Sequence, residues 1–109
     1  MTTYYVEIVC RDVNETNSEA VLRTHVDAIA SAVFSLDDAA GASFSSDLDE
    51  RTITFGFMIS ESGKATALRD GLVLAQTALH AAGAATRGWT DAYEFVSKTA
   101  RSERELSAV

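Results

Sequence analysis

The chain has no proline, a single cysteine, and no hydrophobic run long enough to cross a bilayer. Because Cys10 is the only cysteine, no disulfide can form within the chain, and its apolar surroundings are typical of a small buried side chain. The first residues, MTTYY, lack the basic segment and the apolar core of a secretory signal. We therefore expect a cytoplasmic protein with no membrane partner.

Basic side chains are also scarce, with 9 lysines and arginines against 16 aspartates and glutamates, for a net charge of −7. The imbalance lies in residues 1–54, which carry three arginines and ten acidic residues, whereas residues 55–109 carry six of each sign. An acidic surface repels phosphate backbones, and no local basic patch is evident. We expect no nucleic-acid partner.

A length of 109 residues with 47% hydrophobic content is typical of one domain that buries its own core. The apolar pattern extends to about residue 97. Residues 98–109 are mostly polar. The sequence therefore predicts a single domain over 1–97, followed by a polar C-terminal tail or a short helix over 98–109.

Hydrophobic periodicity divides the chain into six elements, since a period of two residues is typical of strands and one of 3.6 of helices. Thr16 and Glu19 have the spacing of a capping box, so the first helix should begin near residues 16–18, and Gly83 should end the second. The predicted strands are Tyr4–Cys10, a short strand around Phe44, Ile53–Ile59 and Trp89–Val96, and the predicted helices are Val21–Leu36 and Leu68–Ala82.

This element order predicts an α+β fold: a two-layer ferredoxin-like βαββαβ sandwich, with an antiparallel sheet and both helices on one face. Right-handed crossovers place the first and third strands in the centre of the sheet. The open face then carries a mild apolar patch at Tyr5, Val9 and Met58 among serines and threonines. Such a face is either an ordinary solvated surface or the contact surface of a homodimer.

Two short segments resemble nucleotide-binding motifs but lack residues that those functions need. Residues 53–59 resemble part of the aromatic RNP motif of the RRM family, yet both isoleucines alternate in phase with Phe55 and Phe57, which predicts that the rings pack in the core. Residues 62–64 (SGK) resemble the end of a phosphate-binding loop, but Met58 stands where its first glycine belongs. We expect neither RNA binding nor nucleotide hydrolysis.

We predict no cofactor, no metal site and no catalytic residue. His25 and His80 lie on different expected helices with no neighbour at metal-ligand spacing, and one cysteine cannot complete a zinc site. The acidic turn at residues 47–51 lacks the positions of a calcium loop, and no serine has the pattern of a nucleophile elbow.

The least regular part of the sequence, Gly83–Trp89, joins the second helix to the last strand, and the segment of interest begins at Leu79 in that helix. It resembles a segment in small uncharacterised ferredoxin-like proteins of high-GC bacteria, where His-Ala-Ala-Gly ends a helix and Gly-Trp follows; Arg87 replaces the proline common in that group. The resemblance implies the same size and element order, but no activity. Trp89 either staples the last strand to the helices or forms, with Arg87, Tyr93 and His80, the rim of a pocket or subunit contact.

Together these observations favour a non-enzymatic protein- or ligand-binding module that acts as a homo-oligomer, most simply a homodimer. Two alternatives stay open. A small dimeric α+β barrel enzyme requires a cavity between helices and sheet, and an acidic mimic of nucleic acid requires its acidic side chains to gather on one surface. The residues expected to contact a ligand or partner are Trp89, Arg87, Tyr93, His80, Tyr5, Val9 and Met58.

Overall fold

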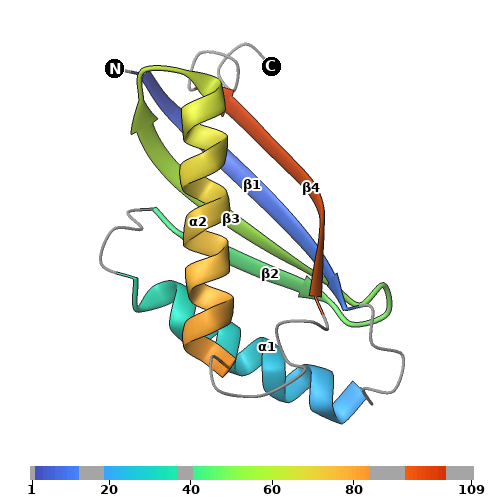
Figure 1. Cartoon of the computed structure of the whole chain (residues 1–109). Coiled ribbons are helices and arrows are strands. Elements are labelled where there is room, and N and C mark those ends of the chain that lie inside the picture. Colours follow the sequence, from blue (N-terminus) through green and yellow to red (C-terminus); the bar gives the residue numbers. More distant parts are fainter. Residues whose placement is uncertain (1, 13–18, 37–40, 84–92, 103–109) are drawn as a thin grey trace.

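The computed structural model describes residues 2–12, 19–36, 41–83 and 93–102. The elements follow one another as β1 (Thr2–Asp12), α1 (Glu19–Phe34), β2 (Ser43–Asp47), β3 (Thr52–Glu61), α2 (Lys64–Gly83) and β4 (Tyr93–Ser102). The four strands form one antiparallel sheet, with α2 lying across it and α1 at its lower end in Figure 1. The predicted βαββαβ order and the α+β class are therefore confirmed.

The sheet has the strand order β2-β3-β1-β4, so the two strands predicted for the centre are there. β1 pairs with β3 from Thr2↔Glu61 to Arg11↔Thr52 and with β4 from Tyr4↔Ser102 to Asp12↔Tyr93. The prediction for the last strand was wrong at its far end. β4 continues past Val96 to Ser102, so residues 98–102 belong to the sheet rather than to a tail or short helix.

The alternation in β1 and β3 produces the core. Tyr4, Val6, Ile8 and Cys10 are buried, and the residues between them are only partly buried, as the period of two predicts. Their neighbours in β3 are Ile53, Phe55 and Phe57, each with 0% exposed surface. The rings of the RNP-like segment thus pack in the core and present no surface for base stacking.

Both helices contribute apolar side chains to this same core. In α1 the buried residues Leu22, Ile29 and Val33 lie on one stripe, as a period of 3.6 residues requires, and the helix packs against α2 and β2. α2 lies close to β1 at Gly71, where the absence of a side chain leaves room for Val6. Neither helix, within the part of the chain that the structure describes, is long and apolar enough to cross a membrane.

Candidate interaction site at the edge of the sheet

The strand β3 is twice as long as its neighbour β2, so part of its edge has no partner strand among the described residues, although Gly41, before β2, lies close to Met58. β2 pairs only with Thr52–Gly56, whereas β1 pairs with all of β3 on the other side. Among the described residues, Phe57–Glu61 therefore pairs with β1 alone. Alternate residues of such an edge direct their backbone N–H and C=O groups outward, where another strand can bind them.

A pocket of about 370 Å³ lies against this edge. Met58 and Ser60 pair with Tyr5 and Thr3, on the open face of the sheet, whereas Ile59 pairs with the buried Tyr4 on the helix face. The pocket thus spans the edge from one face to the other. We call it the edge groove, and its lining residues are Met58, Ile59, Ser60, Asp70, Val73 and Leu74.

The wall of the edge groove formed by α2 is apolar and accessible. Val73 is 53% exposed, and Leu74 beside it is half-buried and packs against the core. Val73 is one of only three large hydrophobic residues exposed in the described part of the chain, with Phe34 and Val96. An exposed valine beside an open strand edge gives a partner both apolar contact and hydrogen-bonding groups.

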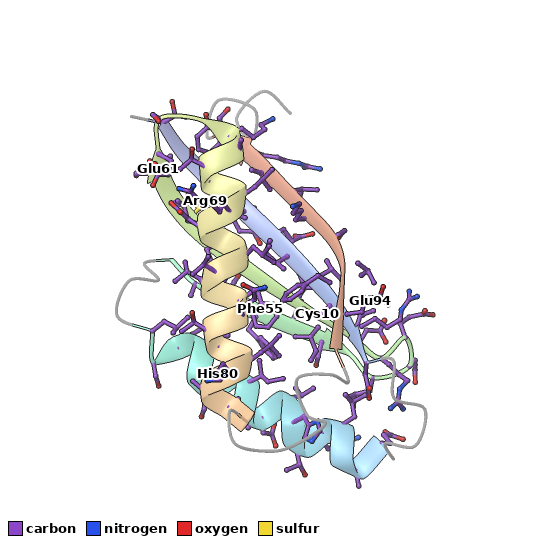
Figure 2. All side chains as sticks on the ribbon, viewed as in Figure 1. Cys10, Phe55, Glu61, Arg69, His80 and Glu94 are labelled. Carbon is purple, nitrogen blue, oxygen red and sulfur yellow. The ribbon has the colours of Figure 1, made fainter. Side chains whose placement is uncertain are left out.

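Two carboxyl groups lie at one end of the edge groove. The Glu61 carboxyl forms a hydrogen bond with that of Asp70, and this bond, partial desolvation and the negative charge of Asp70 raise the pKa of Glu61. The Nε of Arg69 is 3.9 Å from Asp70 Oδ1. Figure 2 shows Glu61 at the end of β3 and Arg69 beside it on α2.

The other strand edges carry features that discourage pairing. β4 has an irregularity opposite Val9 and Cys10, and its exposed side chains include Glu94, Lys98 and Arg101; Figure 2 labels the first of these. β2 has only five residues, largely polar. Bulges, charges and short length are the ways in which native sheets protect their edges. The half-edge of β3 is equally short, at five residues, but it has neither a bulge nor a charged residue before Glu61.

A second polar cluster lies at the opposite end of the sheet. The Asp12 side chain is 0% exposed and accepts a hydrogen bond of 2.6 Å from Arg51 Nη2, while Arg51 C=O accepts the Asp12 N–H at 2.9 Å. His25 of α1 is also buried. Burial lowers the pKa of His25, and the charge of Asp12 acts in the opposite direction. Because Asp12 and Arg51 bind each other, they join β1 to the β2–β3 turn.

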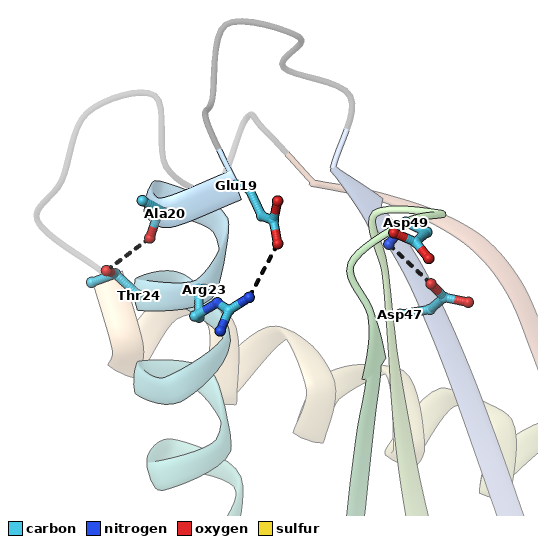
Figure 3. Close-up of polar contacts among 6 residues, drawn as sticks. All are labelled: Glu19, Ala20, Arg23, Thr24, Asp47 and Asp49. Carbon is cyan, nitrogen blue, oxygen red and sulfur yellow. Dashed lines mark hydrogen bonds and ion pairs between the residues drawn. The ribbon is translucent and has the colours of Figure 1, made fainter.

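In the acidic turn at residues 47–51, a side chain binds the backbone of the turn itself. Asp47 Oδ1 accepts the N–H of Asp49 at 3.0 Å, drawn in Figure 3, and that of Glu50 at 3.1 Å. On α1, Arg23 forms an exposed ion pair with Glu19 at 3.1 Å, also in Figure 3. Over residues 2–12, 19–36, 41–83 and 93–102, no three His, Cys, Asp or Glu side chains lie close enough to hold a metal ion.

The predicted site residues are not brought together as one site. Trp89 and Arg87 lie outside the described residues, and of Tyr93 only the backbone, which pairs with Asp12, is described. His80 is exposed on the last turn of α2.

Tyr5, Val9 and Met58 do share the open face of the sheet, as predicted. The Tyr5 hydroxyl is 3.5 Å from Ser43 Oγ, and the ring passes over Gly56, where any larger residue would meet both side chains. Met58 alone of the predicted set lines the edge groove. Its other lining residues escaped sequence reasoning, although the unequal lengths of the second and third predicted strands already implied an open edge.

No family model, curated protein or solved structure matches this chain. The resemblance of Leu79–Trp89 to proteins of high-GC bacteria therefore stays a prediction. What the chain does has to be inferred from its own geometry and charge, and the edge groove is the feature with the most to offer a partner.

Proposed function

We propose that this chain is a non-enzymatic protein-binding domain of the ferredoxin-like class, and that it binds an extended segment of another protein along Phe57–Glu61 of β3. The strand order β2-β3-β1-β4, with every pair antiparallel and both helices contributing to one core, supports the ferredoxin-like assignment. A sheet edge that binds an added strand gains affinity from main-chain hydrogen bonds and specificity from neighbouring pockets.

The observation that carries this proposal is the coincidence of the open half-edge with the edge groove. A bound strand would lie beside Ile59, with one face of its side chains toward the open face of the sheet and the other toward Val73 and Leu74. The edge spans five residues, so we expect micromolar rather than nanomolar affinity, typical of a transient contact.

The structure gives less support to the two alternative functions, a small dimeric α+β barrel enzyme and an acidic mimic of nucleic acid. The volume between α2 and the sheet is filled by Phe55, Phe57 and Val6, all with 0% exposure, and leaves the pockets at the edges rather than between the layers. The acidic side chains do not gather on one described surface. They are distributed over β1, α1, the β2–β3 turn, β3, α2 and β4.

A second copy of the chain is the alternative occupant of the same edge, and would make the homodimer predicted from the sequence. Two copies each carry a net charge of −7, so long-range repulsion opposes their association at low salt. A different protein that presents basic groups to the edge groove meets no such repulsion. We therefore favour a heterologous partner.

Selection from a displayed library of random peptides tests the proposal, with Val73→Gln as the groove variant and Val96→Gln as its matched control. Both valines are exposed, at 53% and 44%, but Val96 lies on β4. Peptides selected on the wild type should bind Val73→Gln about fivefold more weakly, since about 1 kcal/mol of apolar contact is lost. They should bind Val96→Gln as well as the wild type.

Equal binding to both variants would show that the peptides do not occupy the edge groove and would overturn the proposal. Sedimentation of the protein without peptide tests the alternative occupant, a second copy of the chain. A wild-type dimer that Val73→Gln converts to a folded monomer, while Val96→Gln stays dimeric, would assign the groove to a second copy of the chain instead. Circular dichroism of each variant confirms that the fold is kept.

A further inference from the structure

We propose that a second pocket, between β4 and α2, binds a small amphipathic anion, that is, a molecule that joins an apolar tail to a carboxylate. We call it the β4 pocket. It has a volume of about 250 Å³ and is lined by Leu72, Phe95, Val96, Ser97 and Lys98. It shares no lining residue with the edge groove, so this inference does not depend on the proposed function.

One extra residue in β4 forms this pocket. Cys10 of β1 pairs with Phe95, but Val9, the residue before it, pairs with Ser97, so Val96 is the extra residue of a β-bulge. β4, the red strand in Figure 1, bends partway along its length, as a bulged strand does. A regular strand turns alternate side chains to opposite faces, whereas here four consecutive residues, 95–98, line the same pocket.

The bulge brings an aromatic ring and a lysine to one face of the sheet. Phe95 pairs with Cys10 and Lys98 pairs with Ile8, and both residues of β1 are buried under the helices. Residues three apart lie on opposite faces of a regular strand, so Phe95 and Lys98 share the helix face because of the extra residue. Bulges commonly redirect side chains beside binding sites. The irregularity that protects the edge of β4 thus also shapes a pocket.

The surface of the β4 pocket is largely apolar and accessible. Phe95 and Leu72 are half-buried and pack against the core, and Val96 is 44% exposed. A water molecule occupies about 30 Å³, so about eight groups of that size fit in the pocket. This is less than the roughly 300 Å³ or more of pockets that hold drug-sized ligands. The pocket therefore suits the apolar tail of a small molecule.

The charge beside this apolar surface selects the head group. Lys98 is exposed and is the charged residue among those lining the β4 pocket in the described part of the chain. A lysine ammonium donates up to three hydrogen bonds and attracts a carboxylate. A tail that contacts Phe95 and Val96 therefore places an anionic head near a positive charge, whereas a cationic head is repelled. The edge groove, lined by Asp70, has a charge of the opposite sign.

The test is a titration of the isotope-labelled protein with octanoate at neutral pH, followed by the backbone amide signals in NMR spectra. Octanoate should shift the amides of Leu72 and Phe95–Lys98 in a saturable way. Lys98→Gln should weaken its binding about threefold, as expected for one exposed ion pair. Arg101→Gln, which removes the same charge from an exposed residue paired with Tyr5 on the open face, should have no effect.

The two exposed valines separate the two pockets. Val96→Gln should weaken octanoate binding about threefold through lost apolar contact, and Val73→Gln, in the edge groove, should leave it unchanged. This is the reverse of their expected effects on peptide binding. Octylammonium, with the same tail and a cationic head, should bind the wild type more weakly than octanoate does, and should not be weakened by Lys98→Gln.

Three results would overturn the inference. Unshifted amides at Phe95–Lys98, or a loss of binding in Val73→Gln instead of Val96→Gln, would show that the β4 pocket does not hold the tail. Equal binding of octanoate and octylammonium would refute the preference for an anion. Octanoate binding that Lys98→Gln leaves unchanged would show that Lys98 only protects the strand edge.

Discussion

Substitution of Gly71 by alanine tests how α2 is set against the sheet, and therefore how the wall of the edge groove is positioned. A Cβ at residue 71 would overlap Cγ1 of Val6 and would lie 3.2 Å from its Cβ and 3.6 Å from Ile59 Cδ1. Val6 has 0% exposure and lies between Phe57 of β3 and Ala100 of β4, so it has little room to move. The helix has to shift outward or Val6 has to leave its rotamer.

The magnitude follows from two opposing terms. Alanine is favoured over glycine in a helix interior by about 1 kcal/mol, whereas overpacking a dense core costs about 1 to 3 kcal/mol. We therefore expect Gly71→Ala to lower the free energy of unfolding by about 1 kcal/mol. Val6→Ala alone removes two buried methyl groups and leaves a cavity, for a loss of about 2 to 3 kcal/mol.

The double variant separates steric overlap from other causes. If the overlap is real, the methyl group added at position 71 fills the space left by Val6, and Gly71→Ala/Val6→Ala should lose only about 1 to 2 kcal/mol. Independent effects would instead sum to about 3 to 4 kcal/mol, so the expected coupling is about 2 kcal/mol. Urea unfolding followed by far-UV circular dichroism measures all four proteins. Additivity within about 0.5 kcal/mol would refute the close approach of α2 to β1 at Gly71.

Three further predictions concern ionisable groups. Arg51→Ala should destabilise the fold by about 3 kcal/mol, because it removes the cation beside the buried carboxylate of Asp12, and Asp12→Asn should restore part of that loss in urea unfolding. Burial raises the pKa of the Cys10 thiol to about 12, so a thiol reagent should label the native protein only as fast as the protein unfolds. The same reagent should label urea-unfolded protein at once. Fast labelling of the native protein would contradict the burial of Cys10. The pKa of Glu61 is raised above its ordinary value of 4.5 by Asp70, so the folded protein holds that proton more tightly than the unfolded chain does. This contribution to stability is fully present below the pKa of Glu61 in the unfolded chain and is lost as the pH rises through its pKa in the folded protein. The free energy of unfolding of the wild type should therefore decrease relative to that of Glu61→Gln between acid and neutral pH. Parallel plots of the two free energies against pH would contradict the contact between Glu61 and Asp70.

Much of the fold was predictable because one physical signal recurs along the chain. Strand alternation is strongest in Tyr4–Cys10 and Ile53–Ile59, and these segments form the central strands that the structure shows. The last strand has the least regular sequence pattern, and its predicted end at Val96 differs most from the observed end, at Ser102. From Lys98 to Ser102 only Ala100 is apolar and buried, because β4 is an outer strand, so this part of the sequence carries no apolar alternation to read.

The edge groove was not predictable by the same reasoning, since periodicity identifies which face of a strand is buried but not which edge is paired. Met58 was assigned to a patch on the open face, yet its position at the β3 edge depends on where β2 stops. Asp70 and Val73 read as ordinary polar and apolar residues of a helix until α2 is placed beside that edge. Their part in the groove is a property of tertiary structure alone.

The half-edge of β3 is better explained by a binding role than by incidental geometry. An open apolar edge invites aggregation, and this chain protects β4 with charges and an irregularity while keeping β2 short. On β3 the protecting charge comes only at Glu61, after the apolar run, and it is doubled by Asp70 from a different element. Acids at this point repel other acidic chains, including copies of this one, but still admit a segment that carries a basic residue.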